Sequence, residues 1–393
     1  MAIVYCIIFI TFVLCLIFTP IVIKICKKYE IVDIPKDSRR VHSKPMPRIG
    51  GVAIVASMII AFLLYFVITK NIPSISLSKS FWGYLIGAVI IAAMGLIDDL
   101  KGLRARKKFV FQLAAACVVY FFGISISSMK IPFVHSEAVS LAWWLDFPLT
   151  LLWVIGITNA LNLIDGLDGL AAGITAIAST SLLIIFISTS ASLDAIIISA
   201  VLAGAVLGFL PYNFNPAKTF MGDVSSNFLG FTMACASIMG FAKGYTLLAI
   251  ISPLLILGIP IFDTVFAMVR RFVKGQPLLK PDGAHIHHRL IKMGLSQRQA
   301  VLLLYSITTV LCMIAVLLAS ADVWKIVILV LAFICFVFLG FLSMVKTIQE
   351  RGGNTEINKN FSMDVEKEIS TSSAYGKELN KKVEVKIKNK AKK

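Results

Sequence analysis

Long apolar segments alternate with shorter polar ones along most of the chain. A helix needs about 20 mostly apolar residues to cross the ~30 Å hydrocarbon core of a bilayer. Eleven segments meet this requirement and are predicted to be spans: 3–23, 52–69, 81–97, 109–128, 147–164, 170–189, 195–212, 226–242, 246–269, 299–319 and 324–345. The pattern predicts an all-α polytopic integral membrane protein with about eleven transmembrane helices.

Positive charge is distributed unevenly between the two sides of these predicted spans. With eleven spans, 33 of the 38 Lys and Arg residues fall in the connections on one side. The positive-inside rule makes that side cytoplasmic and places the N-terminus outside and the C-terminus in the cytoplasm. This partition accounts for the net charge of +17 without nucleic acid as a partner. The hydrophobic content of 58% also excludes an ordinary soluble domain.

The character of the chain changes after residue 345. Residues 346–393 contain few large apolar side chains and end in the Lys-rich run KKVEVKIKNKAKK. We expect a transmembrane catalytic domain over 1–345 and a basic, disordered cytoplasmic tail over 346–393. Such a tail is attracted to anionic lipid headgroups, and a specific partner site is the alternative.

Six acidic residues lie within or at the ends of the predicted spans. Placing a charged side chain in or near the bilayer costs free energy. Five lie at cytoplasmic span ends, and one lies one or two turns inside a span. They are Asp98, Asp99, Asp165, Asp168, Asp223 and, inside its span, Asp263. Because a carboxylate at such a position usually meets a cation or a phosphate, the six acids are the first candidates for a functional site.

Asp98 and Asp99 are consecutive residues at the end of a span. Consecutive helical positions differ by about 100°, so the two carboxylates are predicted to face different directions. One would face a metal or a reacting phosphate, and the other would be held by a cation from segment 101–108. A solvated helix cap is the alternative.

The segment NALNLIDGLDGLAAG places polar side chains at helical spacing. Asn159, Asn162 and Asp165 recur every three residues and share one edge of a helix end, and Asp168 continues the row. The glycines of this segment form a small face that permits close approach of another helix or a ligand. Amides and carboxylates in this arrangement suit a ribose, a base edge or hydrated Mg²⁺. Packing glycines with capping polar groups would explain the glycines but not both acids.

Two further residues belong to the segment FMGDVSSN. Asp223 is either a metal ligand or the N-cap of the following span. Phe220 either stacks on a planar base or anchors the chain at the membrane interface.

Basic residues gather in two of the polar loops. HIHHR contains His285, His287, His288 and Arg289. These side chains suit a diphosphate cradle better than a transition-metal site, because the other candidate ligands are oxygens, which favour Mg²⁺ or Mn²⁺. In the first cytoplasmic loop Lys44 is a candidate phosphate contact, although a topological charge signal explains most of that loop.

Asp263 follows Pro260, which is expected to kink its span. This acid either lines a groove for a lipid phosphate or pairs with Arg270 or Arg271.

The motifs HSKPMPRIGG, GLIDDLKG, NALNLIDGLDGLAAG, FMGD and HIHHRL together resemble those of the polyprenyl-phosphate N-acetylhexosamine-1-phosphate transferases, over about residues 1–345. The resemblance implies that a polyprenyl phosphate attacks the β-phosphorus of a UDP-N-acetylhexosamine and releases UMP. HIHHRL is similar to the GlcNAc-1-phosphate branch, which uses undecaprenyl phosphate to start teichoic acids, O-antigens and related envelope polymers. The MurNAc-pentapeptide branch typically has three consecutive histidines before Phe, and Thr-Pro-Thr-Met-Gly-Gly where this chain has MPRIGG.

The resemblance also implies residue roles. Asp223 matches a Mg²⁺ ligand, with Asp98 as a second candidate and Mn²⁺ as an alternative ion. Asp98 matches the residue that acts on the lipid phosphate, with Asp99 beside it. Phe220 matches a uracil-stacking position. The nucleotide side matches Asn162, Asp165 and Asp168, and the further substrate contacts are Lys44, His285, His287, His288 and Arg289.

The resemblance places the active site on the cytoplasmic face of a bacterial plasma membrane and carries an expectation of a homodimer. Two other classes remain as alternatives. A secondary transporter would place its acids nearer the midplane and would show inverted repeats. An intramembrane aspartyl protease would need two facing carboxylates inside the membrane and would leave the amides and HIHHR without a role.

Overall fold

Helices form nearly all of the described structure, as the apolar segments predict. The computed structural model describes residues 1–33, 45–70, 77–129, 139–241, 248–273, 275 and 285–319. All of these residues belong to one compact unit, Met1–Leu331. The predicted tail 346–393 lies outside the described residues, so the proposed domain division stays a prediction.

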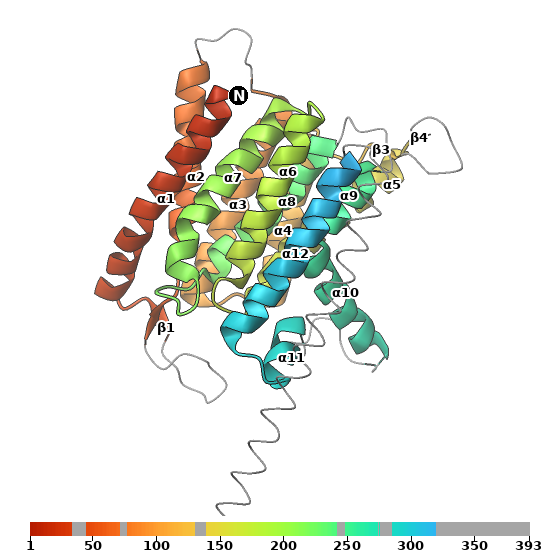
Figure 1. Ribbon diagram of the computed structural model, residues 1–393. Helices are drawn as coiled ribbons and strands as arrows, with labels where there is room; N and C mark the ends of the chain where they lie inside the picture. The colour runs from red at the N-terminus through yellow and green to blue at the C-terminus, as the bar shows by residue number, and fades with distance from the viewer. Residues whose placement is uncertain are drawn as a thin grey trace, which may run out of the picture. The chain divides into compact units, whose positions relative to one another are not determined.

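The described elements follow one another in the order shown in Figure 1. The helices are α1 (Ala2–Lys28), α2 (Val52–Thr69), α3 (Lys79–Lys101), α4 (Ala105–Phe121), α5 (Trp143–Ile164), α6 (Leu170–Ser188), α7 (Leu193–Asn213), α8 (Gly222–Phe241), α9 (Leu248–Ile256), α10 (Gly258–Val273), α11 (Ile286–Lys292) and α12 (Gln297–Ala319). Two short antiparallel strand pairs join β1 (Val32–Asp33) to β2 (Met46–Pro47) and β3 (Ser128–Met129) to β4 (Val139–Ser140).

Within the described ranges, eight helices are long and apolar enough to cross a membrane, namely α1, α2, α3, α5, α6, α7, α8 and α12. A polytopic α-helical membrane protein is therefore confirmed. The other three predicted spans differ in outcome. Segment 109–128 ends early as α4, where the backbone of Ile124 bonds back to Val119 at 2.9 Å. Segment 246–269 is divided, and 324–345 lies outside the described residues, so the count of eleven stays a prediction.

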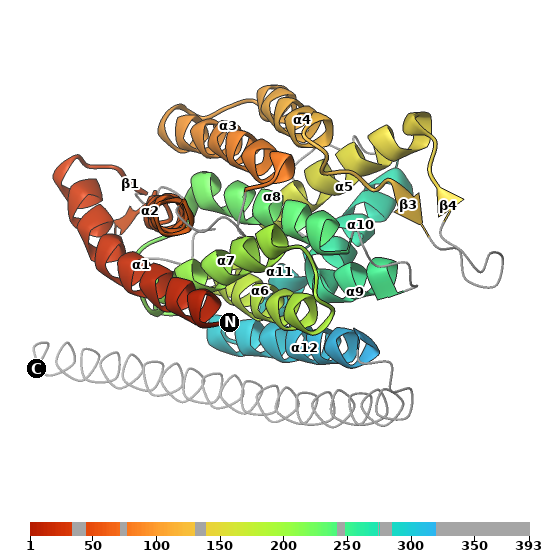
Figure 2. The same cartoon turned by 90° about the horizontal axis from the view of Figure 1, so that it is seen from above.

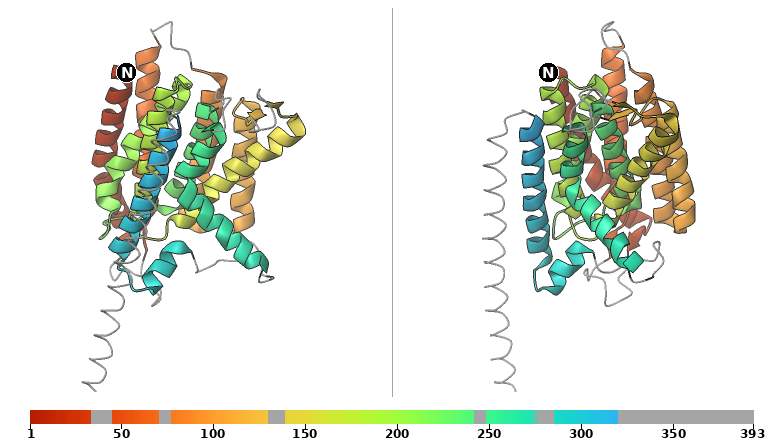
Figure 3. Two further views of the ribbon diagram at one scale, coloured as in Figure 1. Left: turned by 45° about the vertical axis from the view of Figure 1, so that its right-hand side comes forward. Right: turned by 90° about the vertical axis from the view of Figure 1, so that its right-hand side faces the viewer.

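The predicted span 246–269 is two helices rather than one kinked helix. The break falls at Leu257, between α9 and α10. Pro260 lacks an N–H and cannot donate to the carbonyl of Ile256, so the helical hydrogen bonding is interrupted at that point. Figure 3 shows α10 leaving the line of α9. The disturbance predicted at Pro260 thus interrupts the helix at Leu257, three residues earlier, while Leu257 and Ile261 still donate to carbonyls four residues back.

Helix α8 occupies the centre of the packed helices. Seventeen of its residues, Val224–Gly240, are buried. Seen from above, α3, α5 and α7 lie around it (Figure 2), and all three contact it. Gly95 of α3 and Gly230 of α8 permit close approaches, because an added Cβ would lie 2.4 Å from Val224 Cα and 2.6 Å from Thr158 Cα of α5, respectively. A helix buried on all sides holds its first turn rigidly, and that turn carries Asp223.

Successive helices alternate in direction, so their polar connections gather at two ends (Figure 1). The described connecting residues 28–33, 45–52, 101–105, 164–170, 213–222 and 285–297 share the end that also carries α11. These are the connections predicted to share the cytoplasmic side. The grouping is confirmed for the described residues, and its orientation in a membrane stays a prediction.

Candidate active site

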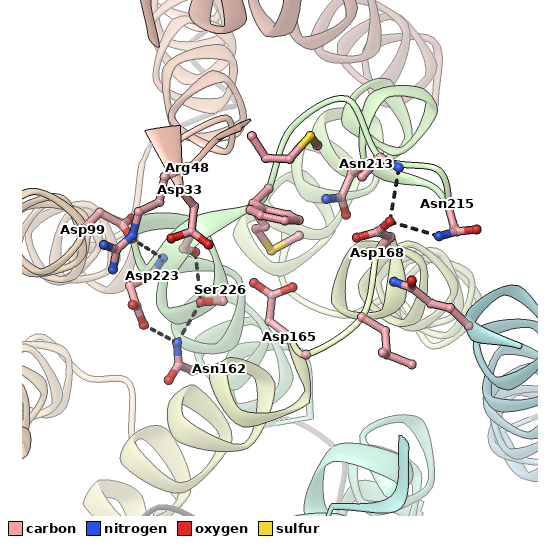
Figure 4. Close-up of a pocket in the computed structure, with 18 of the residues that line it drawn as sticks. Asp33, Arg48, Asp99, Asn162, Asp165, Asp168, Asn213, Asn215, Asp223 and Ser226 are labelled. Atoms are coloured by element: carbon pink, nitrogen blue, oxygen red, sulfur yellow. Dashed lines mark hydrogen bonds and ion pairs between the residues drawn. The ribbon is translucent and has the colours of Figure 1, made fainter. Parts of the chain in front are cut away.

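A cavity of about 750 Å³ opens at this end of the helices. Several short segments from distant parts of the sequence build its walls (Figure 4). The lining residues are Asp33, Met46, Arg48, Asp99, Asn162, Asp165, Gly166, Leu167, Asp168, Asn213, Asn215, Pro216, Ala217, Phe220, Met221, Gly222, Asp223, Ser226, His288 and Gln297. Seven of the predicted site residues are among them: Asp99, Asn162, Asp165, Asp168, Phe220, Asp223 and His288. The motifs therefore meet in one place.

Asp99 caps the first turn of α8. Its Oδ1 accepts the backbone N–H of Asp223 at 3.0 Å, and its Oδ2 accepts that of Val224 at 2.9 Å. Free N–H groups and the positive end of the helix dipole favour a carboxylate there. Arg48 Nε lies 3.5 Å from Oδ1. Gly222 begins the helix with φ +78°, and an added Cβ would lie 2.7 Å from Asp99 Oδ2, so this junction requires glycine.

Asp98 faces a different cation. Its Oδ1 accepts the backbone N–H of Leu103 at 2.6 Å, and its Oδ2 forms an ion pair with Lys108 Nζ. Lys108 Nζ also lies 3.3 Å from Asp223 Oδ1. The prediction that the two consecutive carboxylates diverge, with one held by a cation from 101–108, is confirmed. The sequence did not single out Lys108, because it is one of five cations in that segment.

The Asp223 side chain is held by α5 as well as by α4. Asn162 Nδ2 donates to Asp223 Oδ1 at 2.7 Å and to Ser226 Oγ at 2.8 Å. Asp223 is therefore not the N-cap of its own helix. It lies in the first turn of α8 with its carboxylate turned toward Lys108 and Asn162. Ser226 was missed as a site residue, although its spacing of three from Asp223 was a signal.

The two acids of the NALNLIDGLDGL segment have different environments. Asp168 Oδ2 accepts Asn215 Nδ2 at 3.0 Å and the Ala217 N–H at 3.2 Å, so it fastens the loop after α7. Asp165 is half-buried and faces the cavity (Figure 4). Burial, followed by the negative charges of Asp223, Asp99 and Asp168, raises the pKa of Asp165 to about 8. Asn215 was not foreseen from the sequence.

The residues of HIHHR do not form a single cradle. His288 lines the cavity. His287 is buried. Its ring packs against Gly166, one of the glycines predicted to permit close approach, and a Cβ added at Gly166 would lie 2.3 Å from His287 Nε2. Burial, followed by the positive charge of His288, lowers the pKa of His287 to about 4, so this ring is neutral at pH 7. The Arg289 guanidinium instead lies over the Phe266 ring, 5.1 Å from its centroid.

Asp263 holds the start of α11. Its Oδ2 lies 2.9 Å from His285 Nδ1, and its Oδ1 accepts the Ile286 N–H at 2.8 Å. Asp263 and His285 are both buried. The structure thus gives this acid a partner that the sequence analysis did not consider, the first histidine of HIHHR. Asp263 positions the segment that places His288 at the cavity.

Two further predicted contacts have limited structural support. Phe220 lies in the cavity wall, and its backbone N–H donates to the Pro47 carbonyl at 2.9 Å. Lys44 lies outside the described residues, and its predicted phosphate contact stays a prediction.

The acid-rich wall is suited to a divalent cation bound together with a substrate. No group of three or more His, Cys, Asp or Glu side chains within the described part of the chain forms a ready-made metal site. Mg²⁺, however, typically takes one or two carboxylates together with substrate phosphates and waters. Lys108 already bridges Asp98 and Asp223. The residues that fit a cation at the cavity are Asp223 and Asp165, because both carboxylates line it.

The fold and this cavity define a polytopic membrane enzyme with an acid-rich site at one end of its helices. The family model "Glycosyl transferase family 4" matches residues 81–241. The chain is 40% identical to "Probable undecaprenyl-phosphate N-acetylglucosaminyl 1-phosphate transferase" of Bacillus subtilis (strain 168), over 85% of this chain and 88% of that protein. The chain belongs to glycosyl transferase family 4, and it is a membrane transferase.

Two other relatives bear on specificity. The "Decaprenyl-phosphate N-acetylglucosaminephosphotransferase" of Mycolicibacterium smegmatis (strain ATCC 700084 / mc(2)155) is 38% identical over 71% of this chain and 73% of that protein. A "Phospho-N-acetylmuramoyl-pentapeptide-transferase" of Listeria innocua serovar 6a is 33% identical over 56% of this chain and 69% of that protein. The first of these two relatives has the higher identity to this chain.

Proposed function

We propose that the protein transfers N-acetylglucosamine 1-phosphate from UDP-GlcNAc to undecaprenyl phosphate and releases UMP. This would be the first membrane step of an envelope glycopolymer such as a teichoic acid or O-antigen. The observation that carries the proposal is the convergence of Asp99, Asn162, Asp165, Asp168 and Asp223 on one cavity. The name of the Bacillus relative supports the same acceptor and the same transferred group.

The reaction forms a bond between a lipid-phosphate oxygen and the β-phosphorus of UDP-GlcNAc. The bond from that phosphorus to the bridging oxygen breaks, and the electron pair leaves with UMP. A phosphate monoester has its second pKa near ~6, so the lipid phosphate is already mostly a dianion at neutral pH. The protein therefore has to position the reactants and stabilise charge rather than supply a strong base.

Lys108 and Asp98 are suited to the acceptor phosphate. The Lys108 ammonium attracts a phosphate dianion, while its ion pairs with Asp98 and Asp223 fix its position. Asp98 can accept the residual proton when the acceptor arrives as a monoanion. Both oxygens of Asp98 are engaged as well, by the Leu103 N–H and by Lys108. Asp99 is proposed to act indirectly, because both of its partners are backbone N–H groups of the first turn of α8.

The donor is proposed to lie in the cavity, beside the acceptor phosphate. Phe220 would stack on the uracil, and Asn162, Asp165 and His288 would contact the ribose and diphosphate. Mg²⁺, with Mn²⁺ as the alternative, would supply positive charge to the diphosphate oxygens when held by Asp223 and Asp165. The cavity would face the cytoplasm of a bacterial plasma membrane, and the homodimer stays a prediction.

A MurNAc-pentapeptide transferase is the second candidate, because the Listeria relative has that name. The HIHHRL and MPRIGG segments favour the GlcNAc branch. Purified protein in detergent with undecaprenyl phosphate and Mg²⁺ separates the two candidates when UMP release is measured with UDP-GlcNAc and with UDP-MurNAc-pentapeptide. We expect UMP only with UDP-GlcNAc. UMP only with the pentapeptide donor would replace the proposal, and no UMP with any UDP-N-acetylhexosamine would overturn it.

A further inference from the structure

Three amide side chains lie one helical turn inside the site, between the charged residues and the apolar core. Gln112 belongs to α4, Asn159 to α5 and Asn227 to α8. Gln112 and Asn227 are buried, and Asn159 is half-buried. We call these three residues the amide triad.

The amide triad joins its three helices by direct hydrogen bonds. Gln112 Nε2 donates to Asn159 Oδ1 at 3.3 Å and to Asn227 Oδ1 at 3.1 Å. Asn159 Nδ2 returns a bond to Gln112 Oε1 at 2.8 Å. Gln112 and Asn159 thus exchange hydrogen bonds, and Asn227 accepts the second N–H of Gln112. Both donors of the Gln112 amide are used. The arrangement is specific to side chains of these lengths.

Backbone carbonyls fix the direction of the triad. Asn159 Nδ2 also donates to the Ile155 carbonyl, and Asn227 Nδ2 donates to the Asp223 carbonyl, each at 2.8 Å. Since each nitrogen must face a carbonyl, each amide oxygen is turned toward Gln112. A flipped amide would bring two oxygens together, so the two helices set a single orientation.

Each triad member lies one helical turn from one residue of a second layer, which consists of Lys108, Asp223 and the neutral Asn162. We call these three residues the charged layer. Gln112 is four residues after Lys108, Asn227 is four after Asp223, and Asn159 is three before Asn162. These spacings put each pair on the same face of its helix. Lys108, Asn162 and Asp223 also contact one another, since Lys108 Nζ and Asn162 Nδ2 lie 3.3 Å and 2.7 Å from Asp223 Oδ1. The amide layer thus repeats the connectivity of the charged layer one turn deeper.

The charged layer lies where helix order is weakest. Lys108 is in the first turn of α4, Asp223 is in the first turn of α8, and Asn162 is in the last turn of α5. Terminal turns lack part of their internal hydrogen bonding. Interhelical hydrogen bonds between amide side chains hold membrane helices together, so the amide triad restricts how the three ends slide or rotate past one another.

We propose that Gln112, Asn159 and Asn227 are positioning residues that hold the ends of α4, α5 and α8 in the register that brings Lys108 and Asn162 to the Asp223 carboxylate. The Asp223 backbone is then fixed from both sides, with its N–H bound by Asp99 and its carbonyl bound by Asn227. The amides are uncharged, so they hold this geometry without adding charge beside the acids. The inference rests on the proposed function only where turnover is the readout.

The first test uses Gln112→Met, which keeps the length of the side chain and removes its hydrogen bonds. We expect kcat for UMP release to fall about ten- to a hundredfold, because a small misplacement of reacting groups has effects of that size. The KM for UDP-GlcNAc should change less than kcat. The double variant Gln112→Asn with Asn159→Gln keeps an amide pair of the same total length and should recover part of kcat. Unchanged kcat in Gln112→Met would overturn the inference.

The matched control is Ser237→Ala. It removes the hydrogen bond from Trp153 Nε1 at 3.0 Å, which joins α5 and α8 far from the charged layer. Its melting temperature should fall while its kcat is retained. An equal loss of kcat in this variant would assign the effect of Gln112→Met to general stability and overturn the positioning role.

The second test does not depend on turnover. Limited acylation of the folded protein, followed by mass spectrometry, should label exposed Lys107 quickly and Lys108 slowly. In Gln112→Met the ratio of Lys108 to Lys107 labelling should rise at least several-fold. An unchanged ratio would overturn the inference, even in a wild-type protein that releases no UMP. Absence of UMP from the wild-type protein, with the expected change in labelling, would overturn the proposed function alone.

Discussion

Asp99 Oδ1 accepts the backbone N–H of Asp223 at 3.0 Å, across 124 residues of sequence. A residue in the last turn of α3 therefore caps the helix that carries the most central acid of the cavity. Asp98, its neighbour in sequence, pairs with Lys108 and remains beside the site. One member of the consecutive pair fixes the scaffold, and the other is held by the Leu103 N–H and by Lys108. The action of Asp98 on the acceptor phosphate stays a prediction.

Replacing Asp99 should affect both stability and turnover. In Asp99→Asn only one oxygen remains, and the new NH₂ group faces an N–H of the first turn of α8. Loss of a helix cap typically costs about 0.5–2 kcal/mol, so we expect a lower melting temperature in detergent. The kcat for UMP release should also fall, because the Asp223 backbone is no longer fixed. A melting temperature and kcat equal to those of the wild-type protein would contradict the cap.

A buried acid at the other end of the helices provides the control for this variant. Asp146 accepts hydrogen bonds from Tyr120 Oη at 3.2 Å and from Thr150 Oγ1 at 3.1 Å. Asp146→Asn should lower the melting temperature but keep kcat. A comparable loss of turnover in this control would show that any buried acid has the same effect.

Lys108 should matter far more than the lysine beside it. In Lys108→Met the carboxylates of Asp98 and Asp223 lose their shared ammonium, and the acceptor phosphate loses its nearest cation. Removal of one preorganised electrostatic group typically reduces kcat about 10²–10³-fold, and we expect a loss of that order in steady-state UMP release. Lys107→Met is the matched control, because Lys107 is exposed and next in sequence. Equal losses in the two variants would exclude a specific role for Lys108.

The fold was largely predictable because the length of an apolar segment is a direct requirement of the bilayer. The places where the prediction failed depend on local backbone bonding. Segment 246–269 is apolar enough to be read as one span, yet Pro260 leaves the Ile256 carbonyl without its donor, and the helix breaks at Leu257. Hydropathy alone contains no information on which carbonyl is left free.

Seven members of the site were predictable, but Lys108, Asn215 and Ser226 were not, and neither were the pairings. Asn162, Asp165 and Asp223 sit at span ends on one side, and the topology alone brings such ends together. Asp98 pairs with one of the cations of 101–108, and the direction of α4 decides which one. That direction could not be predicted from the sequence. The pairing of Asp263 with His285 across 22 residues was likewise hidden, because it depends on the break before α10.

Asp263→Asn should weaken donor binding. The remaining oxygen of asparagine can still accept the Ile286 N–H. The new NH₂ group, however, cannot accept a hydrogen bond from His285 Nδ1 as Asp263 Oδ2 does. A lost hydrogen bond to a charged group is worth about 1.5–3 kcal/mol. Since α11 carries His288 into the cavity wall, we expect the KM for UDP-GlcNAc to rise about tenfold with a smaller change in kcat.

Asp194→Asn is the control for the Asp263 variant. Asp194 is a buried acid in the first turn of α7, where Ser78 provides its hydrogen bonds. This substitution should leave KM unchanged. A KM for Asp263→Asn within error of the wild-type value would remove Asp263 from the positioning of α11.

The pKa of Asp165 predicts how stability depends on pH when divalent cations are absent. Its folded value of about 8 is raised above the ordinary 3.8 by burial and by neighbouring carboxylates. Between these two pH values the folded protein binds more protons than the unfolded chain, so this contribution to stability decreases as pH rises and is lost above about pH 8. Melting temperatures in EDTA should therefore fall between pH 6 and pH 9. Asp165→Asn cannot ionise and should show a flatter profile, whereas Asp146→Asn should keep the wild-type slope.

Mg²⁺ added at pH 9 should raise the melting temperature of the wild-type protein more than that of Asp165→Asn. An equal rise in both would remove Asp165 from the proposed cation site.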